Sequence, residues 1–202
     1  MTGPTATSPG GDRLLVLLHG HGDDPTTLLA RRDEIDPDRR CTVVAPTGPV
    51  RLADGTPAWF DDGDAADARR LHEALADVLT DGAAAVGCEP SEAIVVGWSQ
   101  GGAAALALST WPDGPVVAAV GAVAGWLPSF EGVVWRPRPG LPTLVVHGED
   151  DEVVPLPLGR SAARHLERSG VDVTWRAHEV GHELTPEVLA DVATWLADRT
   201  RS

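Results

Sequence analysis

The stretch VVGWSQGG, residues 95–102, places the pattern G-x-S-x-G between an apolar run and an Ala-rich segment. A continuous run of Val and Ile bounded by turn residues is typical of a strand buried on both faces of a sheet. A serine between such a strand and a helix lies on a sharp turn, the nucleophile elbow, which exposes its hydroxyl. Gly97 and Gly101 leave room for that turn. The stretch therefore predicts an α/β fold with Ser99 as a candidate nucleophile.

Apolar runs like the one before Ser99 recur along the chain, and segments with helical spacing lie between them. This alternation predicts a mostly parallel central sheet with helices on both faces. The predicted strands cover residues 14–19, 41–46, 93–98, 116–124, 143–148 and 171–178. The predicted helices cover residues 64–86, 100–111, 157–169 and 186–199.

Capping residues mark the ends of several predicted helices. Possible N-caps at 61–64 precede the first helix, and Gly170 stops the third. Thr185 is the expected N-cap of the last helix, with Pro186 in its first turn. The face of this last helix is apolar and is formed by Val188, Leu189, Val192, Trp195 and Leu196.

Length and composition predict one domain. The chain has 202 residues, of which 43% are hydrophobic, enough for one sizeable core. Residues 1–12 are small, polar and rich in Gly and Pro, so we expect a disordered lead-in followed by a single domain at 13–202.

The net charge disfavours nucleic acid and anionic membranes as partners. The chain has 16 basic and 30 acidic residues, and the net charge of -14 argues against binding to nucleic acid or stable association with an anionic membrane.

No targeting segment or membrane-spanning run is evident, and the two cysteines are expected to be reduced, so we expect a cytoplasmic protein. The sequence makes no prediction of oligomeric state.

A serine nucleophile needs a histidine base, and that histidine needs an acid that fixes its tautomer. In a sheet of this type the order along the chain should be Ser, acid, His. The segment HGEDDEVVP, residues 147–155, follows one predicted strand and supplies Asp151, with Glu149, Asp150 and Glu152 as alternatives. His182 follows the next strand, whereas the competing His178 falls inside it.

The ordered motifs G-x-S-x-G-G, H-G-x-x-D-x-x-V-P and G-H resemble those of the phospholipase/carboxylesterase family of α/β-hydrolases, which includes the acyl-protein thioesterases. Residues 46–61, ending in W-F-D, and AGWLP at 124–128 resemble two further motifs of this family. The resemblance runs from about residue 14 to residue 199. It implies an α/β-hydrolase fold, and the short connections after Gly97 leave no room for a large lid.

Carried over residue by residue, the resemblance implies Ser99 as nucleophile, Asp151 as acid and His182 as base. It implies that the backbone N–H groups of His21 and Gln100 form the oxyanion hole. Trp59 and Trp126 are implied as substrate-binding residues, and no metal or cofactor is required. Trp98 is expected to point away from the nucleophile and pack.

The segment HGHGDD, residues 19–24, is open to a second interpretation as a metal-binding site. His and Asp are common metal ligands, and the pattern resembles the H-x-H-x-D-H motif of the metallo-β-lactamase superfamily. Here the last position is Asp24, and few residues precede the motif. We therefore favour an oxyanion loop that His19 braces.

The predicted function is hydrolysis of small to medium acyl esters, or of thioesters, through an acyl-enzyme. Acyl-protein thioesterase or lysophospholipase activity is the alternative within the same chemistry. A metallohydrolase would instead depend on HGHGDD, and a non-catalytic α/β-hydrolase-fold protein would bind its ligand without turnover.

Overall fold

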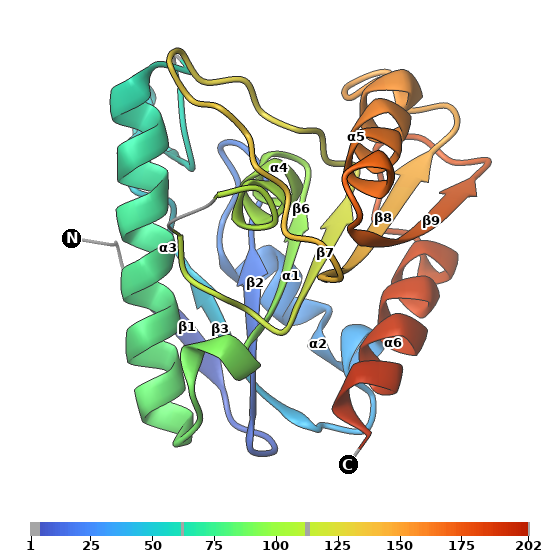
Figure 1. Ribbon diagram of the computed structural model, residues 1–202. Coiled ribbons are helices and arrows are strands. Elements are labelled where there is room, and N and C mark those ends of the chain that lie inside the picture. Colours follow the sequence, from blue (N-terminus) through green and yellow to red (C-terminus); the bar gives the residue numbers. More distant parts are fainter. Residues whose placement is uncertain (1–4, 62, 112–113, 202) are drawn as a thin grey trace.

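The computed structural model describes residues 5–61, 63–111 and 114–201. A seven-stranded sheet in the order β1-β3-β2-β6-β7-β8-β9 forms the centre of the molecule (Figure 1). All neighbours pair in parallel except β1, which is antiparallel to β3. The strands are β1 (Thr5–Ser8), β2 (Arg13–Leu18), β3 (Cys41–Pro46), β6 (Ile94–Trp98), β7 (Ala119–Val123), β8 (Pro142–Gly148) and β9 (Asp172–His178). The predicted fold class is confirmed.

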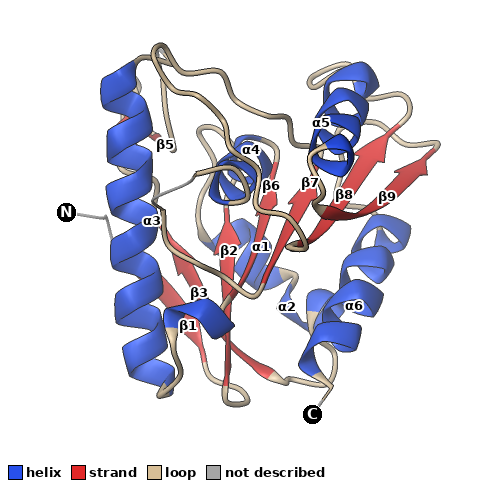
Figure 2. Ribbon diagram, in the orientation of Figure 1, coloured by secondary structure: helices blue, strands red, loops and turns tan. Residues whose placement is uncertain are grey.

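Helices cover both faces of this sheet (Figure 2). The main helices are α1 (Thr26–Ala30), α2 (Arg32–Ile35), α3 (Ala65–Val86), α4 (Gln100–Leu108), α5 (Leu156–Arg168) and α6 (Pro186–Thr200). A small hairpin of β4 (Val50–Arg51) and β5 (Pro57–Ala58) and a 3-10 turn at Pro90–Glu92 complete the elements. Within the described ranges, no helix has the length and apolarity needed to cross a membrane.

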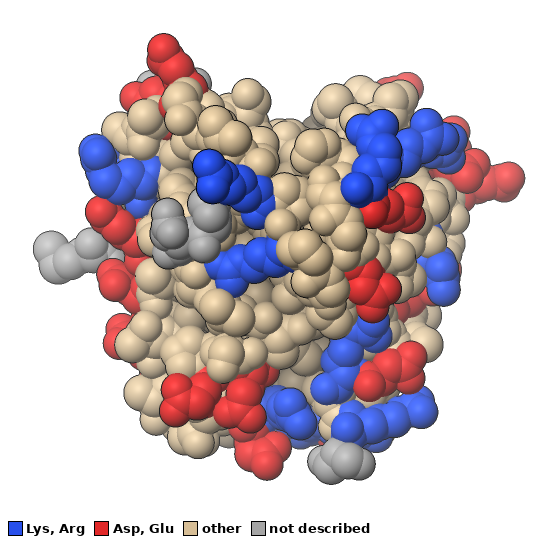
Figure 3. Space-filling model, viewed as in Figure 1, with Lys and Arg blue, Asp and Glu red and all other residues tan. Residues whose placement is uncertain are grey.

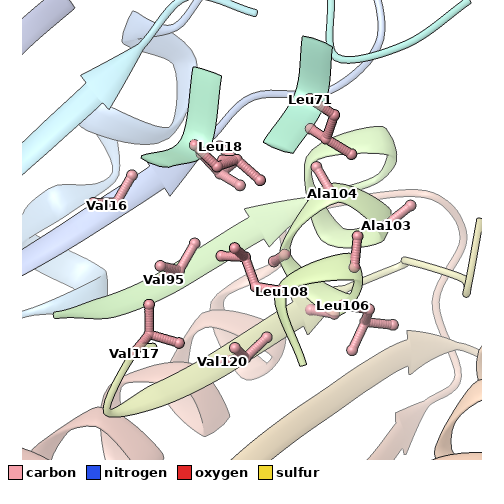
Figure 4. Packing of buried hydrophobic residues seen from close by; sticks show 14 of the residues in the cluster. Val16, Leu18, Leu71, Val95, Ala103, Ala104, Leu106, Leu108, Val117 and Val120 are labelled. Atoms are coloured by element: carbon pink, nitrogen blue, oxygen red, sulfur yellow. The ribbon is translucent and has the colours of Figure 1, made fainter. Parts of the chain in front are cut away.

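The core is divided by the sheet into two apolar clusters. Alternate residues of β2 point to opposite faces, so Leu14 and Val16 join one cluster while Leu15 and Leu17 join the other. Helices α3, α4 and α5 pack on the first cluster, part of which Figure 4 shows, and α1, α2 and α6 pack on the second. Burial on both faces explains why the strands are continuous apolar runs.

The expected disordered lead-in at residues 1–12 is wrong for residues 5–12. Thr5–Ser8 form β1, whose register pairs Thr5 with Pro46. Arg32 fixes the turn that follows, because its guanidinium donates to the carbonyls of Pro9 and Cys41 at 2.8 and 2.9 Å. Thr42 also bonds this segment, since its hydroxyl accepts from the N–H of Gly10 and donates to the carbonyl of Gly11. Backbone pairing and these two side chains therefore order the segment without an apolar sequence. Residues 1–4 lie outside the described residues.

All four predicted helices are present, with small changes at their ends. Asp64 caps α3 by accepting a hydrogen bond from the N–H of Asp67 at 2.7 Å. Helix α4 ends at Leu108 instead of 111, where the N–H groups of Ser109 and Thr110 donate to carbonyls three residues back and tighten the last turn. The last helix buries the whole of its predicted apolar face.

The elbow requires Gly101 for steric reasons that a substitution can test. A Cβ at this position would lie 2.1 Å from the carbonyl oxygen of Leu18. We expect Gly101→Ala to lower the free energy of unfolding by roughly 3 kcal/mol, since rigid backbone must move. In the control Gly82→Ala, the new Cβ meets the side chain of Leu14, whose methyls lie at 3.0 and 3.2 Å and can shift, so the change should stay within about 1 kcal/mol. Urea denaturation measures both, and equal stability of the two variants would contradict this account.

Candidate active site

Ser99 lies on a strained turn between β6 and α4. Its φ of 56° and ψ of -121° are unusual for a residue with a side chain. The N–H of Ser99 donates to the carbonyl of Val123 at 2.8 Å, and a Cβ at Gly97 would lie 2.0 Å from the carbonyl oxygen of Gly101. The close packing at Gly97 and Gly101 confirms the steric reason for the G-x-S-x-G pattern.

Ser99, His182 and Asp151 form a chain of hydrogen bonds. The Nε2 atom of His182 lies 2.9 Å from the Oγ atom of Ser99, and its Nδ1 atom lies 2.7 Å from the Oδ2 atom of Asp151. Because a carboxylate only accepts, Nδ1 carries the proton and Nε2 is left free to accept from the serine hydroxyl. The structure thus brings together the three side chains that the sequence singles out, from three separate loops.

Asp151 differs from its acidic neighbours in burial. It is 5% exposed, whereas Glu149, Asp150 and Glu152 are exposed. Its Oδ1 atom accepts from the N–H groups of Val153 and Val154 at 2.9 and 2.8 Å, which leaves Oδ2 for His182. The carboxylate is therefore oriented by the backbone of its own loop.

A buried histidine holds this loop in place. The Nε2 atom of His147 lies 2.7 Å from the carbonyl oxygen of Val154 and 3.7 Å from the Oδ2 atom of Asp151. By contrast, His178 lies on β9, where its Nε2 atom contacts Asp191 at 2.8 Å. His178 is thus engaged elsewhere and does not contact Ser99.

His19 stabilises the loop that follows β2. Its Nε2 atom accepts from the N–H of Gly48 at 2.9 Å, so its Nδ1 carries a proton and donates to the carbonyl of Gly20 at 2.6 Å. Burial lowers the pKa of His19 and favours this neutral form. Both ring nitrogens are thus engaged with backbone. Among the residues that the structure describes, no group of three or more His, Cys, Asp or Glu side chains is placed to hold a metal ion.

The two N–H groups implied for the oxyanion hole belong to the first residue of α4 and to the loop that follows β2. Gln100 is the first residue of α4, so its N–H has no acceptor within the helix. His21 follows Gly20, and its side chain is exposed. The next residue, Gly22, donates to the carbonyl of Pro57 at 2.9 Å, which ties this loop to the β4–β5 hairpin.

The side chain of Gln100 is buried and has a separate structural role. Its Oε1 atom accepts from the N–H of Trp59 at 2.9 Å, and its Nε2 atom donates to the carbonyl of Phe60 at 2.7 Å. These bonds attach the W-F-D segment to the start of α4.

The expected role of Trp59 as a wall of the substrate site does not agree with its position. Trp59 is 0% exposed, and its Nε1 atom donates to the carbonyl of His19 at 2.9 Å. It therefore supports the loop that follows β2, because its large ring packs in the core against the His19 imidazole, with ring centroids 5.2 Å apart. Trp126 remains half-buried and packs edge-on against Phe60 at 6.2 Å.

Trp98 lies in the site, contrary to the expectation that it points away. Its indole stacks on the imidazole of His182, with ring centroids 5.3 Å apart and planes at 30°. No sequence pattern signals this contact, because the unusual backbone angles of the elbow decide where the neighbouring side chains point.

The parallel sheet and the bonded Ser99, His182 and Asp151 define an α/β-hydrolase. The model of the family described as phospholipase/carboxylesterase matches residues 11–199, and the chain belongs to this family. The resemblance inferred from the sequence is therefore confirmed.

Relatives and solved structures agree with this assignment. A probable carboxylesterase of Arabidopsis thaliana, SOBER1-like, is 31% identical over 93% of this chain and 79% of its own length. Acyl-protein thioesterase 1 of Mycosarcoma maydis is 32% identical over 96% of this chain and 90% of its own length. The crystal structure of a Bacillus cereus carboxylesterase superposes with a TM-score of 0.84 at 21% identity, covering 98% of this chain and 95% of that one, and shows the same fold.

Proposed function

We propose that the protein is a serine carboxylesterase that hydrolyses small to medium acyl esters through an acyl-enzyme. Family membership identifies the chain as a hydrolase of carboxylic esters. The observation that carries the mechanism is the continuous hydrogen-bonded path from Ser99 through His182 to Asp151, at 2.9 and 2.7 Å. This is the geometry that general-base activation of a serine requires.

In the first half of the reaction, the Oγ atom of Ser99 attacks the ester carbonyl while Nε2 of His182 takes its proton. The carbonyl π electrons move to the oxygen, which becomes the oxyanion. Collapse of this intermediate expels the alkoxide leaving group, which takes the proton from His182. In the second half, His182 removes a proton from water, the hydroxide attacks the acyl-enzyme, and Ser99 leaves with that proton as the acid is released.

The N–H groups of Gln100 and His21 are proposed to bind the oxyanion. The N–H of Gln100 lies at the N-terminus of α4, where backbone donors and the helix dipole favour negative charge. In the described chain, no hydrogen bond uses the N–H of His21. Each such donor is worth about 3 kcal/mol of activation free energy in enzymes of this kind.

The connections around the sheet favour small and medium substrates. Among the described residues after β6, the helices are α4, α5 and α6, the longest loop covers 124–141, and no lid domain is inserted. Acidic and basic side chains are interspersed over the face seen in Figure 3, and the net charge of -14 disfavours highly anionic leaving groups. Both cysteines are free thiols, which fits a reducing cytoplasm.

Acyl-protein thioesterase activity is a second candidate. A thioester presents the same carbonyl to Ser99, and relatives named acyl-protein thioesterase match 90% or more of this chain. Parallel assays with an ester and a thioester of equal acyl length distinguish the two by their kcat/KM values.

The proposal is tested by combining turnover with covalent labelling. We expect hydrolysis within a series of p-nitrophenyl esters from acetate to palmitate, fastest with the shorter chains and unaffected by a chelator. A fluorophosphonate should stop turnover and add its phosphonyl mass to the tryptic peptide that contains Ser99. Preincubation with a good ester should delay this labelling. Loss of activity to the chelator, or labelling of a different residue, would disprove the serine mechanism.

A further inference from the structure

We propose that Trp98 is a positioning residue for His182. The face of its indole holds the imidazole in line with Ser99 and stabilises the imidazolium that forms when Ser99 loses its proton. The ring centroids are 5.3 Å apart, within the range of about 6 Å over which a cation is attracted to the face of Trp. The inference rests on the proposed function, because His182 becomes charged only if it acts as the base.

The position of the indole is restricted by the backbone beneath it. A Cβ at Gly20 would lie 3.2 Å from the Cε3 atom and 3.3 Å from the Cζ3 atom of Trp98, closer than side chains normally pack. The same Cβ would lie 3.6 Å from the Cβ atom of Ser99. Gly20 therefore lets the oxyanion loop pack directly against the indole beside the nucleophile.

Hydrogen bonding does not explain the orientation of Trp98. Its Nε1 atom is buried and has no hydrogen-bond partner among the described residues. A buried N–H without an acceptor is unfavourable, and buried tryptophans usually satisfy it. The ring is thus held by packing, and its stacking on His182 is the contact through which it can influence the base.

The charged groups around His182 stay the same when Trp98 is replaced. Asp151 bonds to Nδ1 at 2.7 Å, and His147 lies on the other side of that carboxylate, 3.7 Å from Oδ2. Asp150 directly precedes Asp151, Glu183 directly follows His182, and both side chains are exposed. Since the Trp98 variants add and remove no charge, a change in the protonation equilibrium of His182 reports the lost indole.

The test compares Trp98→Leu and Trp98→Phe with the wild type over a range of pH. We expect Trp98→Leu to lower kcat about tenfold, with KM changed less than twofold, because the lost interaction is strongest in the charged state. The acid limb of the kcat/KM profile should move to lower pH, by up to about one unit, because imidazolium without the indole loses its proton more readily. Trp98→Phe should be intermediate in both respects, because it keeps an aromatic face.

Trp111 provides a matched control at the opposite end of α4. Its ring stacks on His72 at a centroid distance of 4.8 Å, so Trp111→Leu removes an equivalent pair far from Ser99. This control should keep the wild-type kcat and acid limb. A Trp98→Leu variant with unchanged kcat, or with reduced kcat but an unmoved acid limb, would overturn the inference.

A second measurement separates this inference from the proposed function. NMR signals of the His182 ring, followed against pH in wild type and in Trp98→Leu, report the protonation equilibrium without turnover. An equal titration midpoint in both proteins overturns the role of Trp98 even if the wild type is an active esterase. A lower midpoint in the variant supports that role even if no tested ester is hydrolysed.

Discussion

Replacing Ser99 with alanine is expected to lower kcat for ester hydrolysis by about 10⁴-fold or more while the protein stays folded. The variant removes the only atom that forms the acyl-enzyme in the proposed mechanism. The oxyanion donors belong to the backbone and remain, so weak residual acceleration through them is the most that should survive. Initial rates with the best p-nitrophenyl ester, together with thermal unfolding of the same preparations, measure both effects.

Ser109 offers a control on the same helix. It is also buried, but its hydroxyl donates only to the carbonyl of Leu106 at 2.7 Å, at the far end of α4. Ser109→Ala should therefore keep the wild-type kcat. Activity of Ser99→Ala comparable to that of this control would rule out a serine nucleophile at position 99.

Asp151→Asn is expected to lower kcat by a similarly large factor, and the contacts of the Asp151 carboxylate explain why. Oδ1 accepts from two backbone N–H groups, so the amide oxygen of an asparagine will occupy that position. Its NH2 group then faces Nδ1 of His182, which must become the acceptor. The ring proton moves to Nε2, and His182 loses the lone pair with which it takes the proton from Ser99.

We expect kcat to fall by about 10⁴-fold in Asp151→Asn, with KM changed little. Asp150→Asn is the matched control, because it removes the same charge from the adjacent, exposed position. It should retain most of the wild-type rate. If the two variants were equally active, or Asp150→Asn alone lost activity, the assignment of the acid would have to change.

Much of the fold could be predicted because parallel strands buried on both faces are continuous apolar runs in the sequence. Strand β1 has no such run, since Thr5–Ser8 is an edge strand with half of its residues exposed and is held by pairing with β3. The short helices α1 and α2 and the β4–β5 hairpin are likewise fixed by tertiary contacts. Periodicity reports burial, and each of these short elements buries only one apolar residue, Leu28, Ile35 or Ala58, which is too few to show a period.

In the active site, too, some features could be predicted from the sequence pattern, and others depend on tertiary contacts. Ser99, Asp151 and His182 were indicated by the order of strands and turns, because the chemistry requires those residue types at those places. The expected positions of Trp59 and Trp98 are wrong for two different reasons. Trp59 is held in the core by its hydrogen bonds to Gln100 and His19, and the direction of Trp98 is set beside the strained backbone of Ser99. A sequence identifies which loop carries a group, but the direction of a ring is decided by its three-dimensional neighbours.

Gln100 complicates the interpretation of an alanine scan of this enzyme. Its backbone N–H is the proposed oxyanion donor, while its side chain joins the segment at Trp59 and Phe60 to α4. Truncation to alanine leaves the donor in place but releases the segment, so a slower variant would invite the false conclusion that the amide side chain contacts the substrate. A backbone ester at this position, introduced by semisynthesis, would remove the N–H alone and separate the two contributions.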